Sequence, residues 1–182
     1  MRSLLLLLFA LNASNLSWSQ RYEPVESKSS ITFKIKNFGS TVDGSFKGIK
    51  GTIRFDPNEL STSRFDVSVA SSSIDTGIEL RNKHLRKDEY FDVTKFTEIH
   101  FISTKIEPSS QVDRFTITGM LTIKKTTKEI KFDFFVMKQG PDYQFKGEFQ
   151  LNRRDYGVGG SSFSMADELK VFLSVNCIGV RI

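Results

Sequence analysis

The sequence predicts an all-β fold of eight antiparallel strands, either closed as a barrel or packed as a sandwich. The first observation is that apolar and polar residues alternate through most of the chain, as in strands with one face toward an apolar interior. The second is that turn-forming clusters separate these runs, including FDPNE (55–59), EPSSQ (107–111), KQGPD (138–142) and GVGG (157–160).

Eight alternating runs give the expected strands in order. In the first run, Ile31, Phe33 and Ile35 share one face, and the intervening Thr32 and Lys34 share the other. Each later run again places apolar residues at every second position, which is the side-chain period of a strand. The expected strands are 31–35, 52–56, 64–70, 98–101, 114–123, 129–136, 142–151 and 169–177.

One segment between the third and fourth strands breaks the alternation. Its apolar residues have the spacing of one side of a helix, and they are Ile78, Leu80, Leu85 and Phe91. We therefore expect a short helical excursion around residues 76–90, with these four side chains toward the barrel. Asp75 or Thr76 would cap the start of its helix. Residues 78–96 are also the densest run of charges in the chain, which indicates a charged outer surface.

Residues 1–19 have the order of a secretory signal peptide. Arg2 is followed by the apolar run LLLLLFAL (4–11) and by small residues before Gln20. We expect cleavage before Gln20, leaving residues 20–182 as a single domain that is periplasmic or secreted. No later segment has the roughly 18 consecutive apolar residues that a membrane helix needs.

Charge and cysteine content narrow the function further. The formal net charge is +5 and becomes +4 without Arg2, and the basic residues are interleaved with acidic ones. This pattern disfavours a nucleic-acid-binding protein, which gathers its basic residues on one face. Cys177 is the only cysteine, so no intramolecular disulfide forms. It lies in an apolar run and is expected to be a small buried hydrophobe.

The polar residues do not form a recognisable active site. Hydrolysis by a triad requires a nucleophile, a base and an orienting group, and the chain has no G-x-S-x-G elbow and only His84 and His100 as imidazole bases. His84 and Asp88, four residues apart, would supply two metal ligands at most and more often form a local salt bridge. Acidic residues near them lie among lysines and arginines, which lower a carboxyl pKa. We expect no enzyme, no metal and no resident cofactor.

Phenylalanine dominates the inward faces of the expected strands. The chain has 17 phenylalanines, and all but Phe9 follow the signal peptide. An eight-stranded barrel can be filled by its own side chains or can hold one small ligand. Gly119, Gly147 and Ser103 would lie among the bulky residues and leave room or allow bending. The residues alone leave the filled and hollow options open.

The segment SSSIDTGIELRNKHLRKDEYFDVTKFTEIHF (71–101) resembles the YceI-like family of polyisoprenoid-binding, lipocalin-like proteins. Three other segments are similar to motifs of this family and occur in the same order: the opening hairpin within 29–57, ITGMLTIKKTTKEI (117–130) and LNRRDYGVG (151–159). The resemblance covers nearly all of residues 21–182. Asn82 replaces the usual aspartate, which would weaken one ion pair, and Lys125 replaces a glycine, which would change a hairpin turn.

The resemblance implies an eight-stranded lipocalin-like barrel whose apolar cavity holds an isoprenoid-tailed lipid, such as a polyprenyl derivative or a quinone. By strand phase, the expected lining residues are Phe33, Ile53, Phe65, Val67, Phe101, Phe115, Ile117, Leu121, Phe132, Phe134, Phe145, Phe149, Val171 and Leu173. The expected residues of the structural cap over the cavity are Asp75, Arg81, His84, Leu85, Phe91, Asp92 and Arg153.

The leading hypothesis is thus a non-catalytic carrier of an isoprenoid or other long-chain lipid, with a homodimer as a further implication of the resemblance. The alternative is an exported structural or stress-response barrel with a self-filled core. A third hypothesis, a reaction centred on His84, predicts that His84→Ala abolishes activity without affecting folding.

Overall fold

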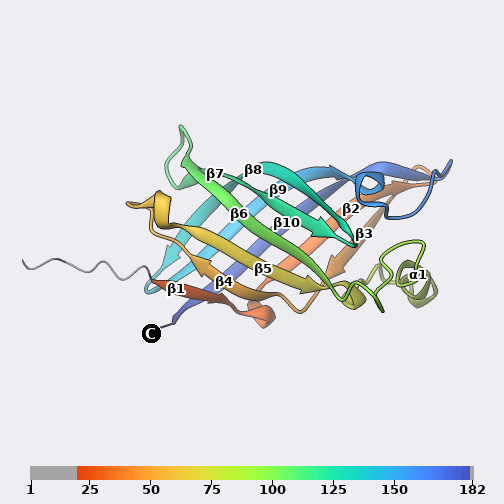
Figure 1. The fold of residues 1–182 in the computed structure, drawn as a ribbon, viewed down its shortest axis with the longest axis horizontal. Coiled ribbons are helices and arrows are strands. Elements are labelled where there is room, and N and C mark those ends of the chain that lie inside the picture. Colours follow the sequence, from red (N-terminus) through yellow and green to blue (C-terminus); the bar gives the residue numbers. More distant parts are fainter. Residues whose placement is uncertain (1–19, 181–182) are drawn as a thin grey trace, which may run out of the picture.

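The structure is a computed structural model that describes residues 20–180. Its strands form one antiparallel sheet that curves into a barrel (Figure 1). The signal peptide expected in residues 1–19 lies outside the described residues. The strands are β1 (Arg21–Pro24), β2 (Ser30–Asn37), β3 (Ser40–Phe46), β4 (Lys50–Arg54), β5 (Arg64–Ala70), β6 (Glu98–Pro108), β7 (Arg114–Ile123), β8 (Thr126–Gln139), β9 (Asp142–Asn152) and β10 (Met165–Val180). The helices are α1 (Glu79–Leu85) and the short 3₁₀ turns η1 (Glu26–Lys28), η2 (Leu60–Thr62), η3 (Ser71–Ser73) and η4 (Arg153–Tyr156).

The strand β10 closes the barrel by pairing with three other strands. One edge pairs with β9, whereas the other edge pairs with β2 over Met165–Ser174 and with β1 over Cys177–Val180. Strands β1 and β2 therefore lie end to end and together act as one strand of the ring. Strands β4 and β3, which pair with them, lie end to end in the same way and act as the neighbouring strand. The predicted eight-stranded antiparallel barrel is confirmed, with two of its positions split into two strands each.

Alternation in the sequence did not indicate β1 and β3. The first is only four residues long, and the second (STVDGSF) has too few apolar residues to show a period of two. The strand β10 begins four residues before its expected start, with an irregular register between Met165 and Leu169. In the two-residue turn between β7 and β8, the positive φ belongs to Lys124 (53°) and not to Lys125.

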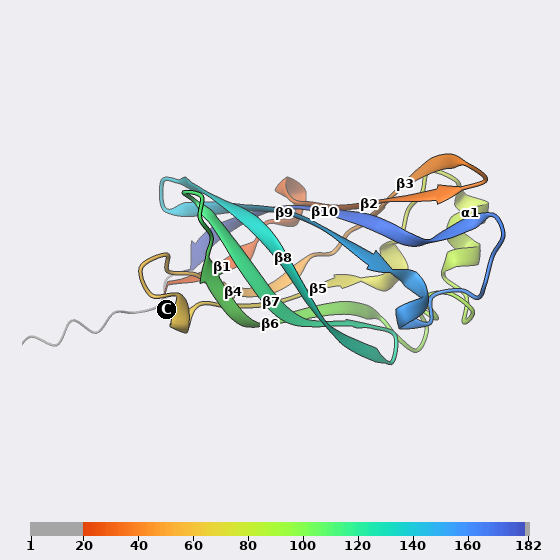
Figure 2. The same cartoon turned by 90° about the horizontal axis from the view of Figure 1, so that it is seen from above.

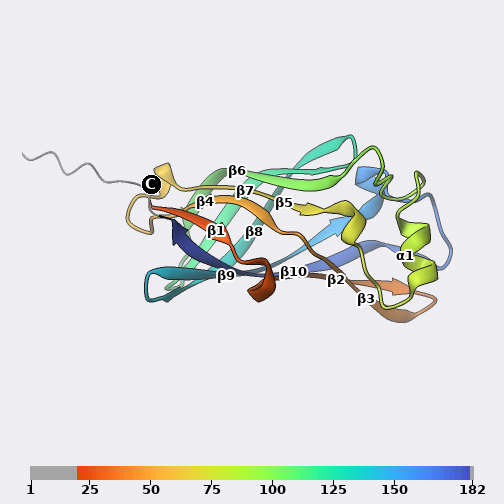
Figure 3. The ribbon, with the colours of Figure 1, turned by 90° about the horizontal axis from the view of Figure 1, so that it is seen from below.

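The ring is complete at one end of the barrel and open at the other. Strand β4 pairs with β5, but β3 pairs with β2 alone among the strands and meets residue 75 only through a bridge. In this bridge the Ser45 N–H donates to the Asp75 carbonyl (2.8 Å) and the Asp75 N–H to the Ser45 carbonyl (3.0 Å). The segment that follows β5 covers this gap, and α1 lies at the same end as the β2–β3 turn (Figures 2 and 3).

The helical excursion is present but shorter than predicted. The helix α1 covers only Glu79–Leu85, and its N-cap is Ile78, without a side-chain cap bond. The expected cap at Asp75 or Thr76 is wrong, because Gly77 (φ 76°) turns the chain before the helix begins. Asp75 instead accepts a hydrogen bond from the Gly77 N–H (2.9 Å).

The prediction that four apolar residues of the excursion face the barrel is half correct. Leu85 and Phe91 lie against the cavity, whereas Ile78 and Leu80 are exposed. A helix of two turns turns only a narrow strip of its surface toward the cavity. In α1 this strip consists of Arg81 and Leu85, which are four residues apart. Leu80 is rotated about 100° from Arg81 on the helix and so faces solvent.

The complete end of the barrel is filled by aromatic side chains. Phe55, which follows β4, is 2% exposed and lies at the centre of this group. Its ring is 5.3–6.4 Å, centroid to centroid, from five others: Phe65, Phe115, Phe134, Tyr143 and Phe145. All five of these pairs meet edge to face, an arrangement that aromatic quadrupoles favour. We call these six rings the aromatic plug.

We expect Phe55→Ala to lower the free energy of unfolding by about 3–5 kcal/mol, because it leaves a cavity at the centre of the aromatic plug. Urea denaturation followed by circular dichroism measures this change. Val112→Ala is the control, since Val112 is exposed and should change stability by less than about 0.5 kcal/mol. A loss below about 1 kcal/mol in Phe55→Ala would contradict the central role of this ring.

Cys177 is 1% exposed, as the sequence predicted. Burial raises the pKa of its thiol from 9.0 to about 12. A raised acid pKa means that the fold favours the neutral thiol, so this contribution to stability is complete below pH 9 and is lost as the pH rises toward 12.

We expect Cys177 in the native chain to resist aromatic disulfide reagents at pH 8, because only the exposed thiolate reacts. In denaturant the same thiol should react completely within the mixing time of the assay. Equal reaction rates in the two conditions would show that the closed end of the barrel opens readily.

Candidate functional site

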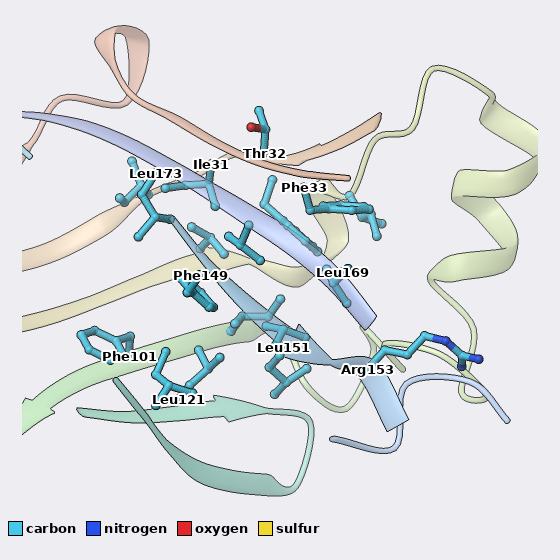
Figure 4. A pocket seen from close by; sticks show the side chains of 18 of the residues that line it. Ile31, Thr32, Phe33, Phe101, Leu121, Phe149, Leu151, Arg153, Leu169 and Leu173 are labelled. Carbon is cyan, nitrogen blue, oxygen red and sulfur yellow. The ribbon is translucent and has the colours of Figure 1, made fainter. Parts of the chain in front are cut away.

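The open half of the barrel contains a cavity. Its volume is about 240 Å³, larger than the roughly 150 Å³ of an engineered apolar cavity that binds benzene. Its wall is almost wholly apolar and is built from inward-facing side chains of strands around the barrel, together with Leu85, Tyr90 and Phe91 from the excursion. Figure 4 shows these side chains converging from several strands.

The cavity is elongated along the barrel. On β10 its lining residues run from Met165 to Val175, and the stretch from Leu169 to Val175 alone corresponds to about 20 Å of strand. The aromatic plug ends the cavity at one side, where Phe65, Phe134 and Phe145 belong to both. At the other side the lining includes Asn37, Arg81 and Arg153, near α1. The cavity therefore opens at the α1 end.

The structure places the sequence-predicted lining residues as follows. All of them line the cavity except Phe115. Phe115 faces inward but lies within the aromatic plug, against Phe55 (5.3 Å) and Phe134 (5.7 Å). Strand phase gives the face of a residue correctly, but it does not tell how far along the barrel the interior is filled.

Many lining residues were not selected from the sequence. Some lie on the same strand faces as the selected ones and could have been found by extending the alternation, namely Ile31, Ile35, Ile99, Ile123, Ile130, Leu151, Leu169 and Val175. Asn37, Tyr90, Val158 and Met165 lie at or beyond strand ends, where alternation gives no signal.

Glycines let the large rings lie against the sheet. A Cβ on Gly44 would come within 2.2 Å of the Phe33 ring, and one on Gly119 within 2.5 Å of the Phe101 ring. These two rings thus occupy the space of absent side chains on neighbouring strands. The free space in the cavity depends on this arrangement, because it keeps both rings close to the wall.

A hydrogen-bonded group of polar side chains lies where the cavity opens. Arg81 donates from Nε to the Thr76 hydroxyl and from Nη2 to the Thr76 carbonyl, both at 2.7 Å. Asn82 is 4% exposed; its Oδ1 accepts from the Thr76 N–H (2.8 Å) and its Nδ2 donates to Asp75 (2.9 Å). The hydrogen bonds from Gly77 and Asn82 lower the pKa of Asp75 below its usual 3.8.

The expected loss of an ion pair at Asn82 is therefore not a weakness in this chain. An aspartate at this buried position could accept from Thr76, but it could not donate to Asp75. The amide has both groups, and so it links the start of the excursion to α1. Within residues 20–180, Arg81 has no carboxylate partner.

Arg153 is the second cation of the opening, and unlike the half-buried Arg81 it is buried, with its charge fully paired. It is 3% exposed and donates to the carbonyls of Ala166 (3.0 Å), Val158 (2.9 Å) and Gly160 (2.9 Å). Nη2 also donates to the carboxylate of Asp167 (2.7 Å). These bonds fix the segment between β9 and β10 over the end of the barrel.

Asp92 and His84, two further predicted cap residues, have different surroundings. Asp92 is 8% exposed with a φ of 46°, and it forms an ion pair with Lys95 (3.2 Å) and a hydrogen bond with Thr94 (3.3 Å). His84 is exposed, and its ring contacts that of Tyr90, with centroids 4.9 Å apart. The salt bridge predicted for His84 and Asp88 does not occur among the described ion pairs.

Asn37 is an exception to the paired polar groups of the opening. Its Oδ1 atom is buried and has no hydrogen-bond partner in the described chain. The residue lines the cavity at the end of β2. An acceptor left in this state costs about 1–3 kcal/mol. A donor on a bound molecule would remove that cost.

Groups that could bind a metal are absent from residues 20–180, within which no three histidine, cysteine or acidic side chains come together. His100 points outward from β6 and contacts Asp66 of β5 (Nε2–Oδ1 2.8 Å). No helix in this part of the chain is long and apolar enough to cross a membrane.

Comparison with known proteins gives a consistent result. The sequence profile of the YceI-like domain matches residues 22–177. Protein YceI of Salmonella arizonae is 30% identical over 152 residues, which cover 80% of this chain and 78% of that protein.

Solved structures share the fold at lower identity. Burkholderia cenocepacia BcnA has a TM-score of 0.79 at 22% identity, with 84% of this chain and 98% of that chain covered. Campylobacter jejuni YceI has 0.69 at 24% identity, with coverages of 79% and 87%. A polyisoprenoid-binding domain from Saccharophagus degradans has 0.71 at 13% identity, with coverages of 87% and 98%. This chain, with its barrel and the motifs of residues 71–101, belongs to the YceI-like family.

Proposed function

We propose that this protein binds and carries an isoprenoid-tailed or similar long-chain amphiphile in its cavity, without catalysis. The observation that carries the proposal is the elongated, almost wholly apolar cavity that opens at the α1 end. The structural similarity to a polyisoprenoid-binding domain supports it.

The chemistry of the wall favours a hydrocarbon chain over a polar metabolite. Burial of each methylene contributes about 0.8 kcal/mol, so a chain of ten carbons would gain roughly 8 kcal/mol before entropic costs. A polar metabolite would lose its hydrogen bonds with water and find few partners along this wall. The elongated form suits a chain better than a compact ring system.

Polar groups at the opening support an amphiphile rather than a pure hydrocarbon. Arg81 has no carboxylate partner in the described chain, and the acceptor of Asn37 is unpaired. A hydroxyl on the head group could donate to Asn37, and an anionic oxygen could accept from Arg81, with the tail extending toward the aromatic plug. In this orientation the head lies near α1.

The alternative of a self-filled structural barrel applies to only one half of the interior, because the aromatic plug fills that half. A catalytic function has no supporting group in the site, and a carrier needs none. We propose an extracytoplasmic location, periplasmic or secreted, on the basis of the signal peptide expected in residues 1–19. A single functional domain over residues 20–182 and a homodimer remain predictions.

We expect Leu173→Trp to abolish uptake of a long-chain prenyl alcohol, because the indole would occupy the middle of the cavity. The matched control is Phe172→Trp, which adds bulk to the next residue on the outer face of β10, outside the cavity. Binding is measured with a fluorescent prenyl alcohol, and co-purified lipid by mass spectrometry of organic extracts. No uptake by the wild-type chain, together with no extracted lipid, would refute the carrier function.

We expect Asn37→Leu to weaken binding of a prenyl alcohol by about 2- to 10-fold, since one hydrogen bond contributes about 0.5–1.5 kcal/mol. Binding of the matching prenyl hydrocarbon should not change. The ligand-free variant should be at least as stable as the wild type, because it lacks the unpaired acceptor. If the alcohol and the hydrocarbon lost affinity equally, the head group would not be near Asn37.

A further inference from the structure

Large apolar side chains are strongly exposed at the open end of the barrel. Among residues 20–180, four large hydrophobic side chains are 80% or more exposed, and they are Phe38, Leu80, Val112 and Phe163. Phe38 lies in the β2–β3 turn, Leu80 in α1 and Phe163 just before β10, and these three segments share one end of the molecule (Figures 2 and 3). Val112 lies in the β6–β7 turn at the opposite end (Figure 1). We call Phe38, Ile78, Leu80 and Phe163 the apolar rim.

Phe38 is both strained and exposed. Phe38 and Gly39 are the two residues between β2 and β3, with φ angles of 49° and 76°. Positive φ at both positions is the geometry of the type I′ hairpin turn, for which asparagine followed by glycine is preferred. A bulky residue at positive φ is an outlier that lowers the folding equilibrium constant about ten-fold. Burial does not offset this cost, because the side chain is 82% exposed.

Two other residues with positive φ have side-chain interactions that compensate. Lys124 (φ 53°) donates from Nζ to the carbonyls of Asp88 (2.9 Å) and Gly157 (3.0 Å). Asp92 is buried and paired with Lys95. The Phe38 side chain has no comparable contact within residues 20–180, so no interaction of the described fold offsets the cost of its positive φ.

The segments of the apolar rim are held in place by backbone hydrogen bonds. The Phe38 N–H donates to the Ser164 carbonyl (2.7 Å), which places the turn beside Phe163. The Ser162 hydroxyl accepts from the backbone N–H groups of Ser164 (3.2 Å) and Met165 (3.1 Å). Phe163 thus stands at the outside of a fixed bend. Both segments are adjacent in sequence to residues that line the cavity, because Asn37 precedes Phe38 and Met165 follows Ser164.

We propose that the apolar rim inserts into the surface of a lipid bilayer and presents the cavity opening to it. Aromatic and aliphatic side chains on separate loops suit shallow insertion at the boundary between head groups and acyl chains. The choice of a bilayer rests on the proposed function, since a lipid would pass from membrane to cavity without crossing water.

Charges around the apolar rim give weaker support. Lys36, Lys83 and Lys87 are exposed and do not appear among the ion pairs of the described chain, and cations of this kind attract anionic lipids. Asp88 and Glu89 lie close in sequence to Lys87 and oppose this attraction. Insertion of the apolar side chains is therefore the main contribution, and salt should weaken binding only modestly.

The test is flotation of the protein with vesicles of phosphatidylethanolamine and phosphatidylglycerol. We expect the wild type to float, and Phe38→Asn and Phe163→Ser each to weaken vesicle binding by about ten-fold, as expected for partial burial of one phenyl ring. Phe38→Asn should also raise the stability of the chain, because asparagine fits the turn. Loss of binding together with a gain in stability cannot come from misfolding.

The matched control is Val112→Ser, which removes an exposed apolar side chain at the other end and should bind vesicles like the wild type. Equal binding by Phe38→Asn and the wild type, or an equal loss in Val112→Ser, would overturn the proposal. A third outcome would also overturn it: the wild type binds no vesicles but forms a dimer in solution, and Phe38→Asn dissociates that dimer.

Uptake of prenyl alcohol without vesicles separates this proposal from the carrier function. Phe38→Asn should retain that uptake, because Phe38 does not line the cavity. A wild-type chain that floats but takes up no prenyl alcohol would support membrane docking and refute the carrier function. Uptake without flotation would refute docking alone.

Discussion

The arrangement of this molecule depends on the pairing of one long strand with two successive partners on the same edge. Strand β10 pairs with β1 near its C-terminal end and with β2 over the rest of its length. The next strands in the ring, β4 beside β1 and β3 beside β2, therefore also lie one after the other along the barrel. Only β4 reaches β5, so the ring closes in one half of the barrel. The excursion from η3 to β6 then has to cover the remaining gap. The filled half, the hollow half and the position of the opening all follow from this pairing.

The sequence was sufficient for the fold and for most of the cavity wall. A period of two marks the inward face of each long strand, and side chains on that face meet in a barrel whatever the exact register. It was insufficient for Phe115, which faces inward but lies in the aromatic plug. The position of a residue along the barrel axis depends on strand tilt and stagger, which the sequence of a single strand does not encode. It was also insufficient for Ile78 and Leu80, because helical spacing does not tell where a two-turn helix begins. Asn37 is a polar residue at the end of a strand, and its unpaired acceptor depends on contacts between distant segments.

The site combines an apolar wall with polar groups that are confined to its opening. Thr76, Asn82 and Asp75 form hydrogen bonds with one another and hold Arg81, while Arg153 fixes the segment before β10. Buried polar groups paired in this way favour one arrangement of the covering segments over others. The excursion thus carries many charges, although its structural effect is to position a cover over a hydrocarbon-lined space.

Incomplete closure of the ring also bears on aggregation. A free strand edge is a template for pairing with another chain, and β3 is the strand that the ring leaves with such an edge. Its exposed stretch is short, since the bridge between Ser45 and Asp75 occupies its far end and Ser73 bonds the backbone of Lys47 just beyond. Asp43, in the middle of β3, adds a charge that pairs with Lys34 of its own hairpin. The segment that covers the cavity therefore also shields the sheet from edge-to-edge association with other copies.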